Sequence, residues 1–461
     1  MLNRFFNFRS KNITFAASLL GASAILSAIL GLIRDRLLAS RFGAGQELDV
    51  YFAAFRIPDF VYGILIMGGL SAVFLPVLTE HFKKNEEQGW LLTNVVLNCF
   101  LVLLVLFCGA LTIFTPFLIS LIAPGFTQEQ RELAVPLTRI MFLSTIFFGL
   151  SSIFSGILHY FNRFLAYSIA PVLYNLSIIS GIIFFVPVFG VMGLAFGVIL
   201  GAFLHLAIQM PSAAASGFRY SLQLNFKYPG LLKIFKFMAW RALGSSVYHI
   251  NLIILTAIAS TLALGSITLF NFAGNMAQFV TGIVGISFAT AAFPVLSKSW
   301  TNGSRDEFLK NFHSTFRQIL FLAIPLSVLI FLFRAQIVKL ILGYGLFGDL
   351  ETGLTAAALG LFCLGIFAFA SIPLLLRAFF SLQDVKTPTV IGLVYMVLTV
   401  GVSFLFVWAL GFPNFFHDFL ERAMNLERAE NIQVIGLPLA VSLSGILYFF
   451  LLLSFLRKKL R

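Results

Sequence analysis

The sequence predicts an all-α polytopic membrane protein with about twelve transmembrane helices, arranged as two six-helix lobes around a central cavity. Three observations support this fold class. Apolar stretches long enough to cross a bilayer recur from residue 13 to residue 456, and a short motif is repeated between the two halves. The chain is also 59% hydrophobic and only 11% charged, with a mean hydropathy of +0.98. A soluble domain of this length would carry fewer apolar residues.

The predicted spans follow from the thickness of the bilayer. A transmembrane helix needs roughly 20 mostly apolar residues to cross a hydrocarbon core about 30 Å thick. The spans that meet this requirement are 13–33, 50–78, 90–114, 133–158, 165–186, 190–210, 237–263, 267–296, 317–333, 353–380, 388–410 and 433–456. Runs such as 97–111 are apolar nearly all round, which is typical of helices in lipid, whereas the strands of a membrane barrel alternate apolar and polar residues.

The positions of lysine and arginine predict the orientation. An even number of spans puts both termini on one side, and a cytoplasmic placement puts most of the 31 basic residues in inner loops. The segment 211–236 is basic and aromatic, so we expect an amphipathic cytoplasmic linker on the anionic inner leaflet, between lobes 1–210 and 237–461. The net charge of +13 reflects this bias, and no nucleic-acid partner is expected.

An internal repeat relates the two lobes. The sequence 60–64, Phe-Val-Tyr-Gly-Ile, recurs at 279–283 as Phe-Val-Thr-Gly-Ile, and each copy is followed by Pro-Val-Leu, at 76–78 and 294–296. The two copies are six spans apart, so the lobes are expected to be parallel. Repeated halves with an even number of spans are typical of transporters whose lobes rock about a cavity at the middle of the membrane.

Catalytic and metal-binding motifs are not found in the sequence. It has no HExxH, GxSxG or P-loop motif, and its three cysteines lie singly within apolar spans. We therefore expect neither an enzyme nor a bound cofactor or metal. Transport would draw on ion gradients, membrane potential or substrate flux.

Charged residues within a span are the first candidates for function, because the bilayer disfavours them. Arg56 and Asp59 flank Pro58 within the span 50–78. One interpretation makes Arg56 a cavity cation for an anionic ligand. The other makes it a structural partner of Asp59 or Asp49, since residues three apart share a helix face.

Polar amides mark a second candidate surface. Asn275 and Gln278, together with Asn271, share one face of the span 267–296, the repeat partner of the span that carries Arg56. They predict a polar wall of the cavity. Other polar residues are buried by position and either line a substrate path or hydrogen-bond neighbouring helices: Asn175, His205, His249 and Asn251.

Several spaced blocks resemble the MurJ/MviN family of lipid II flippases. The opening of the chain carries Leu30–Asp35, Phe42–Gly45, Asp49, Ala54–Pro58 and Phe74–Leu78 in the family's order. Further similar blocks follow nearly to the end of the chain: Ala123–Phe126, Asn162–Phe164, Ala170–Asn175, Gly190–Ala195, Phe293–Ser297, Gly343–Gly345 and Arg377–Pro388.

The resemblance implies the fold of the multidrug/oligosaccharidyl-lipid/polysaccharide exporter superfamily. It also implies a flippase that moves lipid II, the lipid-linked peptidoglycan precursor, from the inner to the outer leaflet of the bacterial cytoplasmic membrane. Membrane lipids and cell-wall synthesis enzymes are then expected partners. The residues expected to bind substrate or gate its path are Arg34, Asp35, Asp49, Arg56, Asp59, Asn275 and Gln278. Arginine suits pyrophosphate because its planar fork can meet two oxygens at once.

Three glycines, Gly43, Gly45 and Gly63, are expected either to permit helix bending or to allow close helix packing. The chain also departs from the family, in which arginines are common at the positions of Ala28, Tyr62 and Asn275 and an acidic residue at that of Met67. Many members have two more C-terminal helices, whereas this sequence ends after the twelfth span. These departures leave two alternatives open: an exporter of another undecaprenyl-linked oligosaccharide or amphiphile, and a non-transporting scaffold of the cell envelope.

Overall fold

The computed structural model describes residues 13–64, 71–426 and 431–460, and every regular element within them is a helix. The chain divides into two compact units. Unit 1 comprises the described residues of Met1–Leu37 and Val50–Leu252, and unit 2 comprises Leu38–Asp49 and the described residues of Ile253–Arg461. The predicted all-α polytopic class is confirmed.

Nine helices among the described residues are long and apolar enough to cross a membrane, and a bent pair makes ten. The pair is α16 (Asp349–Cys363) and α17 (Ile366–Ser381), which meet at 47°. Two further spans were expected. The span 50–78 includes residues 65–70, which lie outside the described residues, and the span 237–263 contributes the shorter apolar helix Ser246–Ser260.

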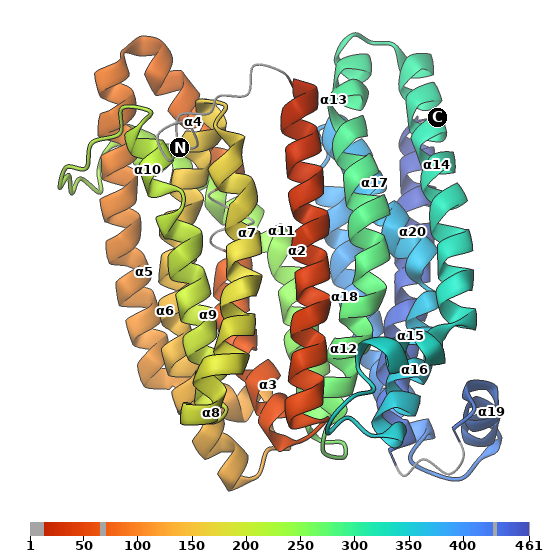
Figure 1. The fold of residues 1–461 in the computed structure, drawn as a ribbon. Helices are drawn as coiled ribbons and strands as arrows, with labels where there is room; N and C mark the ends of the chain where they lie inside the picture. The colour runs from red at the N-terminus through yellow and green to blue at the C-terminus, as the bar shows by residue number, and fades with distance from the viewer. Residues whose placement is uncertain (1–12, 65–70, 427–430, 461) are drawn as a thin grey trace. The chain divides into compact units, whose positions relative to one another are not determined.

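Unit 1 is a helical bundle. Its helices α5 (Glu86–Ile122), α6 (Gln128–Tyr160), α9 (Met192–Ala207) and α7 (Phe164–Ser180) pack side by side in that order (Figure 1). The other elements assigned wholly or partly to unit 1 are α2 (Ile13–Phe42), α3 (Gln46–Val61), α4 (Ser71–Lys84), η2 (Gly181–Phe185), α8 (Val186–Phe189), α10 (Met210–Ala214) and α11 (Pro229–Ser260). An apolar core that includes Phe74, Leu92 and Ile153 fills the junction of α4, α5 and α6.

Local sequence explains several features of this bundle. Asn85 caps α5, and Thr127 with Gln130 forms a capping box at the start of α6. Glycines allow α9 to approach η2 closely, since a Cβ on Gly181 would lie 2.7 Å from the Cα of Gly197. Small residues at such contacts bring helix backbones together in membranes, so a larger residue here would push the two helices apart.

Unit 2 is also a bundle of helices that pack side by side. Helix α17 contacts α13 (Ser287–Thr301), α14 (Arg305–Leu332) and α20 (Gly436–Leu460), and α20 also packs on α18 (Lys386–Ala409). The remaining elements are α12 (Ser266–Val280), η3 (Thr281–Ile286), α15 (Arg334–Ile341), α19 (Phe415–Met424) and η4 (Ile432–Ile435).

The internal sequence repeat has a structural counterpart. In unit 1, residues 62–64 at the end of α3 form a π-helical turn, and in unit 2 the matching residues begin the π-helical segment η3. Each turn contains the glycine of the repeated motif, Gly63 or Gly282. A π-turn widens a helix locally and is frequent at functional sites.

Two predicted boundaries are wrong. The first span was expected to end at residue 33, but α2 continues to Phe42, so Arg34 and Asp35 lie in the helix and not in a loop. The span was expected to end before Arg34 and Asp35 because both are charged, but the ion pair between them offsets the two charges within the helix. The helix expected from residue 237 begins at Pro229, which places Lys233 of the predicted linker on α11. The lobe boundaries 1–210 and 237–461 stay predictions.

Candidate functional site

Arg34 and Asp35 form an ion pair on α2. The Arg34 Nε and Nη2 atoms donate to Asp35 Oδ1 over 3.0 Å and 2.8 Å. The Asp35 side chain is 4% exposed, while that of Arg34 is 23% exposed. The pair therefore neutralises a carboxylate that would be costly to bury alone, and the arginine keeps part of its surface accessible.

Asn175 on α7 fixes the third nitrogen of the Arg34 fork. Its Oδ1 accepts from Arg34 Nη1 at 3.4 Å, and its Nδ2 donates to the Ser27 hydroxyl and carbonyl at 3.0 Å and 3.2 Å. The amide thus bridges two places on α2 that are two turns apart. The result is a guanidinium whose position is set by two helices.

Arg56 and Asp59 lie one turn apart on α3, both within unit 1. Arg56 is only 9% exposed and interacts electrostatically with Asp59 and with Tyr248 of α11. Asp59 is half-buried and also interacts with Arg34. Arg34 and Arg56 therefore share one acidic neighbour, which supports both of the interpretations that the sequence left open.

A pocket of about 250 Å³ opens beside Asp59. Four helices of unit 1 and the π-helical turn after α3 contribute to its lining, which comprises Phe55, Pro58 and Asp59 from α3, Tyr62 from the π-turn, Ser144, Thr145 and Phe148 from α6, Pro171 and Tyr174 from α7, and His205 from α9. Within this lining, the Phe148 ring contacts Tyr62, Tyr174 and His205 at 5.1–5.3 Å between centroids. One acidic group, one imidazole and several hydroxyls thus face a small space with aromatic walls.

Comparison with known proteins identifies the family. The family profile described as lipid II flippase MurJ matches residues 38–461. The chain belongs to this family. A probable lipid II flippase MurJ of Buchnera aphidicola subsp. Schizaphis graminum is 32% identical over 385 residues, which are 82% of this chain and 75% of the relative. The lipid II flippase MurJ of Burkholderia cenocepacia is 28% identical over 84% of this chain and 77% of its own.

Solved structures agree with this assignment. A lipid II flippase MurJ in an inward closed conformation has a TM-score of 0.78 at 25% identity, covering 95% of this chain and 87% of the other. An inward-facing multidrug resistance transporter of the MATE family, in the MOP superfamily, has a TM-score of 0.76 at 14% identity and covers 96% of this chain and 98% of its own. The second likeness shows a shared fold.

The structure shows what lies around the positions at which this chain departs from the MurJ family. Ser27, next to Ala28, accepts a hydrogen bond from Asn175 and so supports Arg34. Tyr62 lines the pocket beside Asp59. Met67 lies outside the described residues.

The Asp49 carboxylate accepts three hydrogen bonds within unit 2. Its Oδ2 accepts from the Gly265 backbone at 2.8 Å, and its Oδ1 accepts from the backbone and hydroxyl of Thr268 at 2.8 Å and 2.7 Å. These groups belong to the first turn of α12, so Asp49 caps a helix that is remote in sequence. Its expected role in gating stays a prediction.

The three glycines differ in their surroundings. Gly43 follows α2 with φ of +63°, a conformation that favours glycine, and its Cβ would lie 2.9 Å from the Leu346 carbonyl oxygen in unit 2. A Cβ on Gly63 would lie 1.8 Å from His249 Nε2, whereas one on Gly45 would make only an ordinary contact. Close packing therefore accounts for Gly63 and Gly43, and their role as hinges stays a prediction.

Asn275 and Gln278 lie on α12 in unit 2, where Asn275 is half-buried and Gln278 is exposed. Asn271 on the same helix donates to the Ile267 carbonyl, 2.6 Å away. Their predicted grouping with Arg34 and Arg56 remains a prediction, because those arginines belong to the other unit.

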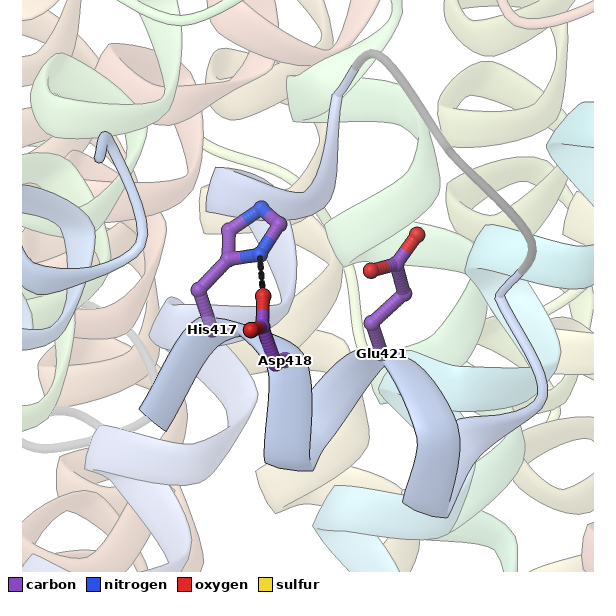
Figure 2. Close-up of side chains that lie close together, drawn as sticks. All are labelled: His417, Asp418 and Glu421. Atoms are coloured by element: carbon purple, nitrogen blue, oxygen red, sulfur yellow. Dashed lines mark hydrogen bonds and ion pairs between the residues drawn. The ribbon is translucent and has the colours of Figure 1, made fainter. Parts of the chain in front are cut away.

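One group of potential metal ligands occurs in the part of the chain that the structure describes. His417, Asp418 and Glu421 lie on α19, and Figure 2 shows their side chains close together. Their ligand atoms are within 4.8 Å of one another, and His417 Nδ1 lies 3.3 Å from Asp418 Oδ1. Imidazole with two carboxylates can bind a divalent cation, and all three residues belong to a single helix of unit 2.

Sequence reasoning did not assign Asn175 or His205 to the site. Both were noted only as polar residues within apolar spans. The signal that could have found Asn175 is its place one turn after Pro171 in a family block. His205 has no such signal, because its approach to the pocket depends on the packing of α9 against α6 and α7.

Proposed function

We propose that this chain moves lipid II from the inner to the outer leaflet of the bacterial cytoplasmic membrane by alternating access. The observation that carries the proposal is that Arg34 on α2 and Arg56 on α3, both in unit 1, each interact with an aspartate. In a chain of the lipid II flippase family, they are suited to an anionic lipid headgroup.

The chemistry of the headgroup matches this arrangement. A pyrophosphate carries several charged oxygens, and a guanidinium can meet two of them with parallel hydrogen bonds. Asp35 and Asp59 offset the arginine charges within an apolar environment. We expect the phosphate oxygens of a bound headgroup to take over part of the interaction that each arginine makes with its aspartate. Release of the headgroup at the other leaflet would restore the arginine–aspartate interactions.

The charge bias of the sequence favours cytoplasmic termini, and the two-unit architecture is typical of transporters that alternate between two faces. Enzymes that make or use lipid II are natural partners for such a protein. Its membership of a flippase family supports transport rather than catalysis.

A second candidate is export of another undecaprenyl-linked oligosaccharide or amphiphile. It is favoured by the residues at three positions where arginine is common in the family: Ala28, Tyr62 and Asn275. Fewer cavity arginines would suit a headgroup with less negative charge.

Complementation of bacteria depleted of their own lipid II flippase tests the proposal. The wild type should restore growth, and Arg34→Ala and Arg56→Ala should not, at equal measured levels in the membrane. Arg41→Ala is the matched control, because Arg41 is an exposed arginine on the last turn of the same helix as Arg34. No rescue by well-expressed wild type would favour the second candidate, and rescue by both variants would contradict the arginine mechanism.

A further inference from the structure

Two titratable side chains from different helices face the same pocket of unit 1. Asp59 of α3 and His205 of α9 both line this space of about 250 Å³. A water molecule occupies about 30 Å³ in the liquid, so several waters can lie between the two side chains. The hydroxyls of Ser144 and Thr145 add to the polar lining. The two titratable side chains therefore line one space large enough for water.

A hydrogen-bond network lies behind His205. Gln209 Oε1 accepts from the Ser155 hydroxyl at 2.8 Å, which leaves Gln209 Nε2 to donate to Ser151 Oγ at 2.7 Å. Ser151 Oγ lies 2.7 Å from His205 Nδ1. In the neutral tautomer with the ring hydrogen on Nε2, the Ser151 hydroxyl donates to Nδ1.

The same network also accommodates a protonated ring. Ser151 Oγ lies 3.4 Å from the carbonyl oxygen of His205 as well as near its Nδ1. If Nδ1 gains a proton, it donates to Ser151 Oγ, and the serine hydrogen turns to that carbonyl. Gln209 keeps its bond to Ser151 in both states. Proton uptake thus reverses one hydrogen bond and requires no repacking of the helices.

The groups around Asp59 set the local charge. Those that interact with it electrostatically are Arg34 of α2, Tyr51 and Arg56 of α3, Tyr62 of the π-turn after α3, and Tyr174 of α7. The tyrosines stay neutral at physiological pH, so the two arginines dominate. Arg56 also interacts electrostatically with Tyr248 and His249 of α11. Against His205, α6 and α9 place the neutral groups of Ser151, Phe148 and Gln209.

We propose that the pocket of unit 1 is a proton-binding site in which Asp59 and His205 share one exchangeable proton. The pocket supplies the water between them, and the network of Ser151, Gln209 and Ser155 keeps His205 satisfied in either state.

The site has a consequence for the substrate, which rests on the proposed function. When Asp59 takes up a proton, the positive charge of Arg56 loses the carboxylate that offsets it. An anionic headgroup then binds Arg56 more tightly, and by reciprocity the bound headgroup favours the proton. Headgroup binding by unit 1 is therefore linked to proton uptake.

The first experiment tests the proton site without substrate. Histidine-labelled protein in nanodiscs is titrated by NMR, and the ring signal of His205 is identified with His205→Gln. Asp59→Asn should move the midpoint of the His205 titration to lower pH by roughly half a unit or more, because it removes a nearby negative charge. Asp306→Asn, at an exposed aspartate in the first turn of α14, is the control and should leave it unchanged.

Ser151→Ala is a second variant, which changes no charge and removes the hydrogen-bond partner of Nδ1. It should also move the His205 midpoint, so the test holds if Asp59→Asn fails to fold. A midpoint that neither variant moves, or a ring that does not titrate between about pH 4 and pH 9, would overturn the proposal.

The second experiment measures lipid II binding in nanodiscs between about pH 5.5 and pH 8. The pyrophosphate diester of lipid II stays ionised throughout this range. Wild-type affinity should rise as pH falls, by at most about tenfold per pH unit for one linked proton. Asp59→Asn and His205→Gln should flatten this dependence, and His313→Gln, at an exposed histidine, should keep it.

The two experiments separate the possible failures. Tight lipid II binding with no pH dependence would overturn the linkage and leave the proposed function intact. Absence of lipid II binding, with His205 still responding to Asp59→Asn, would remove the proposed function and support the proton site.

Discussion

Asp49 and Thr268 are joined by two hydrogen bonds in unit 2, one from the backbone N–H of Thr268 at 2.8 Å and one from its hydroxyl at 2.7 Å. Both end on the same carboxylate oxygen, while the other oxygen accepts from Gly265. Asp49 precedes Thr268 by more than two hundred residues, yet it performs the task of a local helix cap. The start of α12 therefore depends on the first turn of α3.

We expect Asp49→Ala to destabilise unit 2 by on the order of 2 kcal/mol, because buried N–H groups lose a charged acceptor. Asp49→Asn keeps one acceptor oxygen and should be milder. Thermal unfolding can be followed with a thiol-reactive dye, since all three cysteines are buried. In a background with Cys99→Ala and Cys108→Ala, the remaining Cys363 on α16 reports on unit 2 alone.

Glu47→Ala is the matched control, at an exposed acidic residue in the same first turn of α3. It should unfold at the wild-type temperature. If Asp49→Ala also unfolded normally but abolished complementation, the capping role would be refuted in favour of gating.

Asp384 is held in the loop between α17 and α18. It accepts from Lys459 Nζ at 2.6 Å and from the backbone and hydroxyl of Thr387 at 3.0 Å and 2.7 Å. Burial opposes ionisation, but these hydrogen bonds outweigh it and hold the pKa of Asp384 below its ordinary value. The ionised carboxylate therefore stabilises the fold above an ordinary pKa of about 4, and this contribution is lost as pH falls through the lower folded value.

Asp384→Asn should accordingly lower the unfolding temperature at pH 7, and the difference from the wild type should shrink below about pH 4. Glu80→Gln breaks another ion pair with the same 2.6 Å separation, to Lys233. Both of its side chains are nearly half exposed, so that variant should behave like the wild type. A difference for Asp384→Asn that persisted unchanged at low pH would show that charge is not its cause.

Arg34 uses all three of its guanidinium nitrogens, two for Asp35 and one for Asn175. A lysine has one ammonium and cannot reproduce this fork. We expect Arg34→Lys to complement a flippase-depleted strain poorly, despite its conserved charge. Asn175→Leu should also weaken complementation, since it frees Arg34 from α7.

The control for this pair is Arg41→Lys, an exchange of the same kind at an exposed position on α2. It should complement fully. Full growth with Arg34→Lys at wild-type membrane levels would mean that charge alone suffices and that the fork geometry is irrelevant.

The sequence was sufficient for those features that depend on local pattern. Bilayer-length apolar runs predicted the helices, and the repeated Phe-Val-x-Gly-Ile motif predicted two equivalent helices, which do share a π-turn. The end of α2 was missed because hydropathy treats Arg34 and Asp35 as separate charges, whereas the helix contains them as a pair.

Contacts distant in sequence could not be predicted in this way. Asp49 was expected near substrate because its position matches a block of the MurJ family, but nothing local indicates that Gly265 and Thr268 donate to it. The pocket between Asp59 and His205 likewise requires the packing of four helices. Pairing of polar groups within a membrane is a property of the tertiary fold, and one sequence reveals the groups without their partners.

Gly63 offers a test of whether the repeated glycines serve packing or bending. A Cβ at Gly63 would lie 1.8 Å from His249 Nε2, while one at the equivalent Gly282 would meet nothing within 4 Å. We therefore expect Gly63→Ala to lower stability by about 1–3 kcal/mol, the usual range for overpacking, and Gly282→Ala to have little effect. Thermal unfolding and complementation measure both variants.

The double variant Gly63→Ala with His249→Ala separates the two explanations. Truncating His249 removes the imidazole with which the new methyl group would clash. If Gly63 serves close packing, the double variant should therefore recover stability and growth relative to Gly63→Ala alone. Bending at the π-turn depends on the glycine backbone and not on the histidine. A double variant that recovered its unfolding temperature but still failed to complement would therefore establish Gly63 as a hinge.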